Sequence, residues 1–257
     1  MSDQSQPYEI RDYVAILKIP GPITREDDLI QLSYKLSDFC EEVNSNGEIR
    51  AVIICEADEG AFCLEEGMEK GYLSAREISF ERWHSPAERV AQIDLPVIAA
   101  IKGDAMGLGL ELVLACDIRI AAETSHFGMP QIKLDMIPRD GGTQRLSRLV
   151  GGSKALEMIL TGREIDAHEA HRIGLVNKIV SRETVTTTVE EMAKEMASKG
   201  PISLQYTKEA IYKGMDMTLE QGLRLEADLY MLIHTTRDRE KGIMAFQEKR
   251  QPNFQGE

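Results

Sequence analysis

Short apolar runs rich in β-branched residues recur through the first half of the 257-residue chain, with helical patterns between them. Such runs are typical of strands buried on both faces, because a strand with one wet face alternates apolar and polar residues. We expect strands at residues 14–19, 51–55, 96–101 and 118–122. Strands that alternate with helices predict an α/β domain.

The helical patterns carry apolar residues three or four positions apart, which is the spacing of one helix face. The segment 28–43 shows it most clearly, with Leu29, Leu32, Leu36, Phe39 and Val43. A second helix is expected at 81–93. The second half is mostly helical, with an apolar stripe over 189–197 and helices at 203–213 and 218–235. This helical end is either a subdomain or an oligomerisation layer.

The formal net charge of −13 argues against a general affinity for nucleic acid or for an anionic membrane surface, since both need a basic face. The polar first residues do not have the pattern of a signal peptide. The longest apolar runs are too short to span a bilayer. We therefore expect a cytoplasmic protein without nucleic-acid or membrane partners.

The metal-binding and redox residue types are few and scattered. Cys40, Cys55, Cys63 and Cys116 include no CxxC pair, so buried free thiols are expected rather than a zinc site or disulfides. His168 and His171 have the spacing of neighbours on a helix, but no third ligand accompanies them. The sequence predicts no metal site.

The segment 101–117 has the pattern of a site. A strand ending at Lys102 is followed by Gly103, Gly107 and Gly109 and then by an apolar run compatible with a helix. Glycines let the backbone approach a ligand closely, and the first N–H groups of a helix are unpaired. The pattern favours an oxyanion or phosphate site, with a simple tight turn as the alternative. It has neither the Lys-Ser/Thr of a Walker loop nor GxGxxG spacing.

Glu111 lies about one turn into this helix, among Leu110, Leu112 and Val113. A carboxylate in apolar surroundings is either paired or has a raised pKa. We therefore interpret Glu111 as a functional residue. A satisfied core or interface glutamate is the alternative.

Several motifs together resemble the enoyl-CoA hydratase (crotonase) superfamily. They are Lys102-Gly103, Gly107-x-Gly109-x-Glu111, Asp117-Ile118-Arg119, Phe127-Gly128-x-Pro130, Gly141-Gly-Thr-Gln-Arg145, Leu160-Thr-Gly162 and Phe246-x-Glu-Lys-Arg250. The resemblance implies a crotonase-like α/β fold of repeated ββα units. It places the acyl-CoA site in a core over residues 1–195 and a helical trimerisation region over 196–257. It also implies a homotrimer or a dimer of trimers.

The resemblance further implies that two backbone N–H groups bind the oxygen of an acyl-CoA thioester. Each such donor lowers a reaction barrier by about 3–4 kcal/mol where charge develops on that oxygen. The matching donors are the N–H groups of Glu66 and Leu108. Leu64, Gly107 and Asp140 match substrate-lining positions, and Phe246 and Lys249 match positions where a neighbouring subunit touches CoA. Coenzyme A is part of the substrate, and no separate cofactor is implied.

Hydratases of this superfamily use two glutamates. The first matches Glu111, but the second matches Gln131, which can orient water and cannot transfer a proton as a carboxylic acid does. Either Glu111 acts alone, or a nearby group substitutes, or the chemistry is isomerisation, hydrolysis or C–C cleavage. The candidate substitutes are Asp140, Arg139, Glu65 and Glu66. A non-catalytic CoA-binding protein is a further alternative. We favour hydration or dehydration of a bulky, branched or cyclic enoyl-CoA through a thioester enolate, with Glu111 as acid/base.

Overall fold

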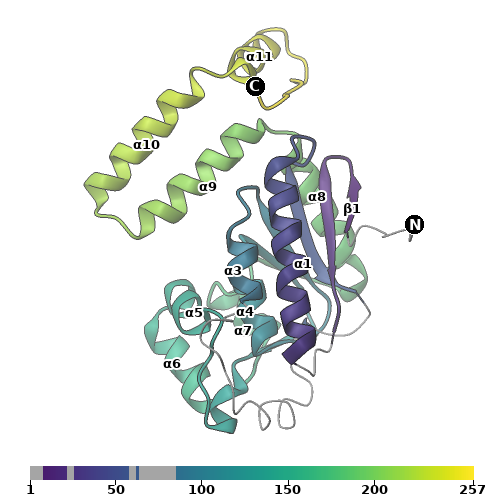
Figure 1. Ribbon diagram of the computed structural model, residues 1–257, viewed down its shortest axis with the longest axis vertical. Coiled ribbons are helices and arrows are strands. Elements are labelled where there is room, and N and C mark those ends of the chain that lie inside the picture. Colours follow the sequence, from purple (N-terminus) through teal and green to yellow (C-terminus); the bar gives the residue numbers. More distant parts are fainter. Residues whose placement is uncertain (1–7, 22–25, 58–61, 64–84) are drawn as a thin grey trace.

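The computed structural model describes residues 8–21, 26–57, 62–63 and 85–257 (Figure 1). A six-stranded sheet forms its centre. In spatial order its strands are β1 (Tyr8–Arg11), β2 (Val14–Ile19), β3 (Ala51–Glu56), β5 (Val97–Ile101), β7 (Ile118–Ala122) and β10 (Lys178–Val180). Only the β1–β2 pair is antiparallel. The four predicted strands are confirmed, and the parallel pairing explains why their sequences are continuously apolar.

A second, smaller sheet was not predicted from the sequence. Its four short strands are β4 (Phe62–Cys63), β6 (Ala105–Met106), β8 (His126–Gly128) and β9 (Ile165–Asp166). Each of β3, β5 and β7 in the large sheet is followed along the chain by a strand of the small sheet. The order β5–β6–α4 is one ββα unit of the kind expected. Strands of two or three residues are too short to show an alternating pattern.

Helices cover both faces of the large sheet. On one face lie α1 (Glu26–Ser45), α3 (Pro86–Ala91) and α4 (Leu108–Leu114), and their apolar side chains share one core with Val52 and Ile54 of β3. On the other face lies α8 (Val185–Ala197), which packs with Ile53 through a second core cluster. Alternate residues of β3 therefore point into different cores, as the pleat requires.

Two 3₁₀ helices and three more α-helices complete the described part of the chain before α9 (Pro201–Met215). They are the 3₁₀ helices η3 (Pro130–Leu134) and η4 (Arg182–Thr184), and the α-helices α5 (Gly142–Val150), α6 (Gly152–Thr161) and α7 (Ala167–Arg172). The predicted helix at 28–43 is confirmed as α1. Within the predicted segment 81–93, the described part holds α3, which Ser85 caps by accepting the N–H of Glu88.

Three C-terminal helices extend away from the two sheets (Figure 1). They are α9 (Pro201–Met215), α10 (Leu219–Ile233) and α11 (Arg237–Gln247), and α9 packs against α10. Asp117, the residue before β7, anchors α9, because its carboxylate accepts Lys208 Nζ and Tyr212 Oη, each at 2.8 Å. The division of the chain at residue 195 stays a prediction, since α8 crosses this point and ends at Ala197.

The C-terminal helices expose many large apolar side chains, among them Ile211, Met215, Leu219, Leu223, Tyr230, Met231 and Phe246. Contiguous exposed apolar surface on a protein usually marks an interaction site. No helix in the described part of the chain is long and apolar enough to cross a membrane.

The core between α1 and the sheet makes a direct prediction about stability. Leu36 is 1% exposed in this core, whereas Leu156 on α6 is 57% exposed. Leu36→Ala should lower the free energy of unfolding by about 2–5 kcal/mol, through lost burial and the cavity left behind. Leu156→Ala is the matched control, with an expected change within about 0.5 kcal/mol. Urea unfolding of both variants measures the difference, and equal losses would contradict this core.

Candidate active site

The start of α4 forms the first part of the site. Gly107 precedes the helix with φ 52° and ψ −123°, a backbone conformation open to glycine and strained for other residues. The Gly107 N–H donates to the carbonyl of Gly128, and the Gly107 carbonyl accepts the N–H of Glu111. The N–H of Leu108 has no acceptor among the residues that the structure describes. Within the described residues this turn therefore presents the N–H of Leu108 without an acceptor, beside the glutamate of the same helix.

Glu111 is fully buried and held by the backbone. Its Oε1 accepts two N–H groups, from Asp140 and from Gly142, each at 2.7 Å. Its Oε2 lies 3.5 Å from Nε2 of Gln131. Burial raises the pKa of Glu111 to about 7, although the N–H bonds from Gly142 and Asp140 act in the opposite direction. Near neutral pH this group can therefore both take up and release a proton.

Gly142 allows the close approach to Glu111. A Cβ atom at this position would lie 2.8 Å from Cβ of Pro138 and 2.9 Å from Oε1 of Glu111. A larger residue would push the carboxylate away from the N–H that binds it. Glycine at position 142 thus has a geometric reason that no local sequence pattern indicates.

Gln131 lies in η3 and is 4% exposed. Its Nε2 faces Glu111, and its buried Oε1 has no hydrogen-bond partner. A buried acceptor without a donor costs free energy, so such atoms mark places where a water or ligand group is received. Within the described residues Oε2 of Glu111 has only the long contact with Gln131, and Oε1 of Gln131 has no partner, so both oxygens can accept a further hydrogen bond.

Asp140 connects the site to α3. Its carboxylate accepts the hydroxyl of Ser85 and, at 2.8 Å, the N–H of Ala87. The Asp140 carbonyl accepts Nη1 of Arg145 at 2.9 Å. Burial is the main cause that raises the pKa of Asp140, whereas the bond from Ser85 lowers it. The side chain thus fixes the loop whose N–H groups hold Glu111, and its role in lining substrate stays a prediction.

Four other predicted site residues lie either far from Glu111 or outside the described part of the chain. Leu64 and Glu66 lie outside the described residues. Phe246 is 86% exposed on α11 and Lys249 follows that helix, at the opposite end of the molecule from α5 and α6 (Figure 1). Ser85 was missed as a site residue, although Ser85-Pro86 is a helix-start signal. No group of three His, Cys, Asp or Glu residues suited to a metal occurs in the described segments.

The chain matches the family model described as enoyl-CoA hydratase/isomerase over residues 30–257. It is 35% identical to the short-chain-enoyl-CoA hydratase of Clostridium acetobutylicum over 245 residues, which cover 92% of each chain. It is 36% identical to the mitochondrial methylglutaconyl-CoA hydratase of Homo sapiens over 229 residues, which cover 86% of this chain and 68% of the relative.

Solved structures agree with these sequence matches. The crystal structure of enoyl-CoA hydratase from Bacillus anthracis superposes with a TM-score of 0.85 and 38% identity, covering 95% of this chain and 96% of the other. A Geobacillus kaustophilus enoyl-CoA hydratase structure gives a TM-score of 0.87 at 29% identity, covering 97% and 96%. The predicted crotonase-like α/β fold with a helical C-terminal region is thereby confirmed.

The buried carboxyl of Glu111 makes stability depend on pH. The pKa of this group rises from 4.5 to about 7 on folding, so the stability present below pH 4.5 is lost as pH rises through about 7. The shift corresponds to about 3 kcal/mol. Glu111→Gln removes this loss, so its unfolding free energy relative to wild type should rise by about that amount between roughly pH 4 and pH 8. Urea unfolding across this range measures it.

The control for this measurement is Glu88→Gln, at an exposed glutamate on α3. Its difference from wild type should stay constant over the same pH range. A Glu111→Gln difference that also stays constant would mean that the carboxyl titrates near its ordinary pKa.

The anchoring role of Asp140 predicts a loss of stability on truncation. Asp140→Ala leaves the hydroxyl of Ser85 and the N–H of Ala87 buried without acceptors. Each orphaned donor costs about 1–3 kcal/mol. Thermal unfolding should show a clear loss for Asp140→Ala, a smaller one for Asp140→Asn, which keeps one acceptor oxygen, and none for the exposed control Asp94→Ala. An Asp140→Ala variant as stable as the control would contradict the anchor.

Proposed function

Because the chain belongs to the enoyl-CoA hydratase/isomerase family, we propose that it catalyses the hydration of an enoyl-CoA, or the reverse dehydration, with Glu111 as its single acid/base. The observation that carries this proposal is the buried carboxyl of Glu111, whose pKa is raised to about 7. One oxygen is fixed by two backbone N–H groups, and the other is left to face Gln131.

The thioester oxygen is assigned to the N–H of Leu108, together with that of Glu66. When water adds to the β-carbon, negative charge develops on the thioester oxygen as the enolate forms. The unpaired N–H at the start of α4 supports this assignment, because a fixed donor stabilises that charge without reorganising. Since backbone groups supply the donors, Leu108 and Glu66 act here through their N–H and not through their side chains.

One carboxylate is sufficient for the proton balance. Ionised Glu111 removes a proton from water as its oxygen bonds to the β-carbon, and the C=C electron pair moves toward the thioester. The protonated Glu111 then gives that proton to the α-carbon. A pKa near 7 suits both steps, because neither form is strongly favoured. Gln131 orients the water through its unpaired Oε1 and stays neutral.

We propose a branched acyl group as the substrate. The similarity to methylglutaconyl-CoA hydratase at 36% identity supports this choice, alongside the similarity to a short-chain-enoyl-CoA hydratase. Gln131 adds no second negative charge beside Glu111, which sets this site apart from a two-carboxylate hydratase. The preference for a bulky, branched or cyclic enoyl-CoA over a short linear one rests on the methylglutaconyl-CoA relative.

We also propose that the chain assembles as a homotrimer or a dimer of trimers. The exposed apolar side chains of α9, α10 and α11 support an interface there, because water contact with this surface is unfavourable. In such an assembly Phe246 and Lys249 reach a neighbouring subunit's CoA, where the Lys249 ammonium pairs with a phosphate.

Two substitutions test the chemistry. Glu111→Gln should lower kcat roughly a hundredfold to ten-thousandfold on methylglutaconyl-CoA and crotonyl-CoA, because it removes the proposed acid/base. Gln131→Glu should keep activity and move the ascending limb of kcat/KM to higher pH, since a second carboxylate raises the pKa of Glu111. The Glu88→Gln variant should match wild type.

Product analysis in ¹⁸O-labelled water separates the alternatives. Label in a hydroxyacyl-CoA of unchanged chain length is expected for hydration. Label in a free acid would indicate thioester hydrolysis, a shortened or ring-opened CoA product C–C cleavage, and a shifted double bond without label isomerisation. CoA binding without turnover, or full activity in Glu111→Gln, would rule out the proposed role of Glu111.

A further inference from the structure

Arg145, the fourth residue of α5, folds its side chain back past the start of the helix. Its Nη1 donates to the carbonyl of Asp140 at 2.9 Å, and its backbone N–H donates to the carbonyl of Gly141 at 2.7 Å. One residue thus binds two successive carbonyls in the turn at residues 140–142, which leads into α5.

The same turn holds Glu111. The N–H groups of Asp140 and Gly142 donate to its Oε1, and the two carbonyls that Arg145 binds lie between these donors along the backbone. The Gly141 carbonyl and the Gly142 N–H belong to one planar peptide group, so a bond to the oxygen also orients the N–H. The bond from Nη1 fixes the preceding peptide group, which joins the two donors. Arg145 therefore restricts the rotations that would turn the donors away from the carboxylate.

Gly141 leaves room for this contact. A Cβ atom at this position would overlap Nη1 of Arg145 and lie 3.0 Å from its Cζ. The residue also has φ 97°, in the left-handed region that glycine adopts without strain. Glycine at position 141 is therefore needed both for the turn and for the approach of the guanidinium.

The position of Arg145 is electrostatically unfavourable for α5 itself. The start of a helix carries a partial positive charge, which favours acidic side chains and disfavours a cation. The first turn of α5 has no acidic residue, and Gly141 offers no side-chain cap. Arg145 forms no ion pair within the described chain, whereas Arg148, three residues later, lies 3.9 Å from Asp216. A local rule that is broken in this way is expected at a functional position.

Other charged groups lie near Arg145 without holding the turn. Five of them line a cleft of about 430 Å³ together with Arg145, and they are Asp117, Arg119, Arg148, Lys208 and Asp216. Within the described chain none of the five forms a hydrogen bond with the 140–142 turn. The charge of Asp140 raises the pKa of Glu111, but it acts less strongly than the two N–H bonds, which lower this pKa. The N–H bonds therefore decide the direction in which a change at Arg145 moves the titration of Glu111.

We propose that Arg145 is a positioning residue for Glu111, because it fixes the two peptide groups that present both N–H donors to the carboxylate. Its effect on turnover rests on the proposed hydratase function, whereas its effect on the carboxyl does not. Without the guanidinium the donors turn away from Oε1, and the charged form of Glu111 loses hydrogen bonds that stabilise it.

Arg145→Met keeps an apolar stem and removes the guanidinium. It should lower kcat on enoyl-CoA roughly tenfold to a hundredfold, because the acid/base is misplaced, and should leave KM within about twofold of wild type. The ascending limb of kcat/KM should move to higher pH, because addition of water needs the ionised carboxylate. Arg148→Met is the matched control on the same helix, since its guanidinium binds Gln144. This control should match wild type in all three quantities.

A second measurement does not depend on turnover. Urea unfolding compares Glu111 with Glu111→Gln across pH, once in the wild-type background and once with Arg145→Met. The stability that a buried carboxyl provides at low pH is lost as pH rises through its pKa in the folded state. With Arg145→Met this loss should continue to higher pH than in wild type, since the pKa of Glu111 rises when its N–H bonds weaken.

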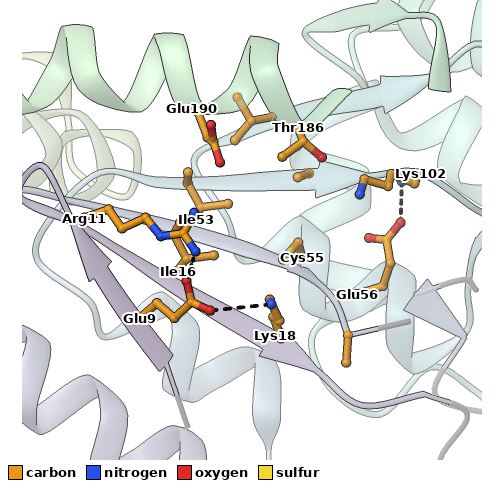
Figure 2. A pocket seen from close by; sticks show the side chains of 13 residues that line it. Glu9, Arg11, Ile16, Lys18, Ile53, Cys55, Glu56, Lys102, Thr186 and Glu190 are labelled. Carbon is orange, nitrogen blue, oxygen red and sulfur yellow. Dashed lines mark hydrogen bonds and ion pairs between the residues drawn. The ribbon is translucent and has the colours of Figure 1, made fainter. Parts of the chain in front are cut away.

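Glu56 is the internal control for this titration. It is also buried, and its Oε1 accepts the backbone N–H of Lys102 at 2.7 Å (Figure 2). Burial raises its pKa, as it does for Glu111, but the 140–142 turn has no part in holding it. The pH dependence of the difference between Glu56 and Glu56→Gln should therefore be the same with and without Arg145→Met.

Three results would overturn the proposal. They are an unchanged titration of Glu111 in Arg145→Met, an equal shift for Glu56, which would indicate a general loosening, and an equal effect of Arg148→Met. Arg145→Gln, whose side chain is shorter, replaces Arg145→Met in the same comparisons if that variant does not fold. A wild-type protein without enoyl-CoA turnover would contradict the proposed function, and the titration of Glu111 would still decide the role of Arg145.

Discussion

The site is built around two hydrogen bonds, which the backbone N–H groups of Asp140 and Gly142 donate to Oε1 of Glu111. Removing a carboxylate from water raises its pKa, and hydrogen bonds to its charged form lower it again. With both effects present, the pKa of Glu111 is about 7. Stronger hydrogen bonds to the charged form would lower this pKa, and weaker ones would raise it. The two donors therefore set the chemistry of the carboxyl as well as its position.

These two hydrogen bonds require the chain between η3 and α5 to keep one conformation. Gly142 keeps its own Cβ out of the space that the carboxylate occupies. Asp140 turns its side chain away from Glu111 and binds Ser85 and the N–H of Ala87 on α3. One residue thus serves two elements, because its backbone holds the carboxylate and its side chain holds the loop. The sheets set this arrangement, since α4 follows β6 and α3 precedes β5.

Much of this frame could be predicted from the sequence. The β-branched runs identified β2, β3, β5 and β7, because parallel strands in a two-sided core leave a strong local signal. The small sheet has no such signal in the sequence, since its strands have only two or three residues. Glu111 stood out because a carboxylate among leucines needs an explanation. Ser85 and Gly142 did not, because their roles depend on contacts with residues 55 and 31 positions away, which no local pattern encodes.

Two buried glutamates illustrate how hydrogen-bond partners decide the role of a carboxylate. Glu111 follows β6 and receives two N–H groups on one oxygen, while its second oxygen faces a side-chain amide. Glu56 ends β3 and receives the Lys102 N–H on one oxygen, while its second oxygen receives none. Burial raises the pKa of both groups. An oxygen beside a neutral amide can exchange a proton with a substrate, whereas a buried oxygen that receives no donor costs the fold free energy.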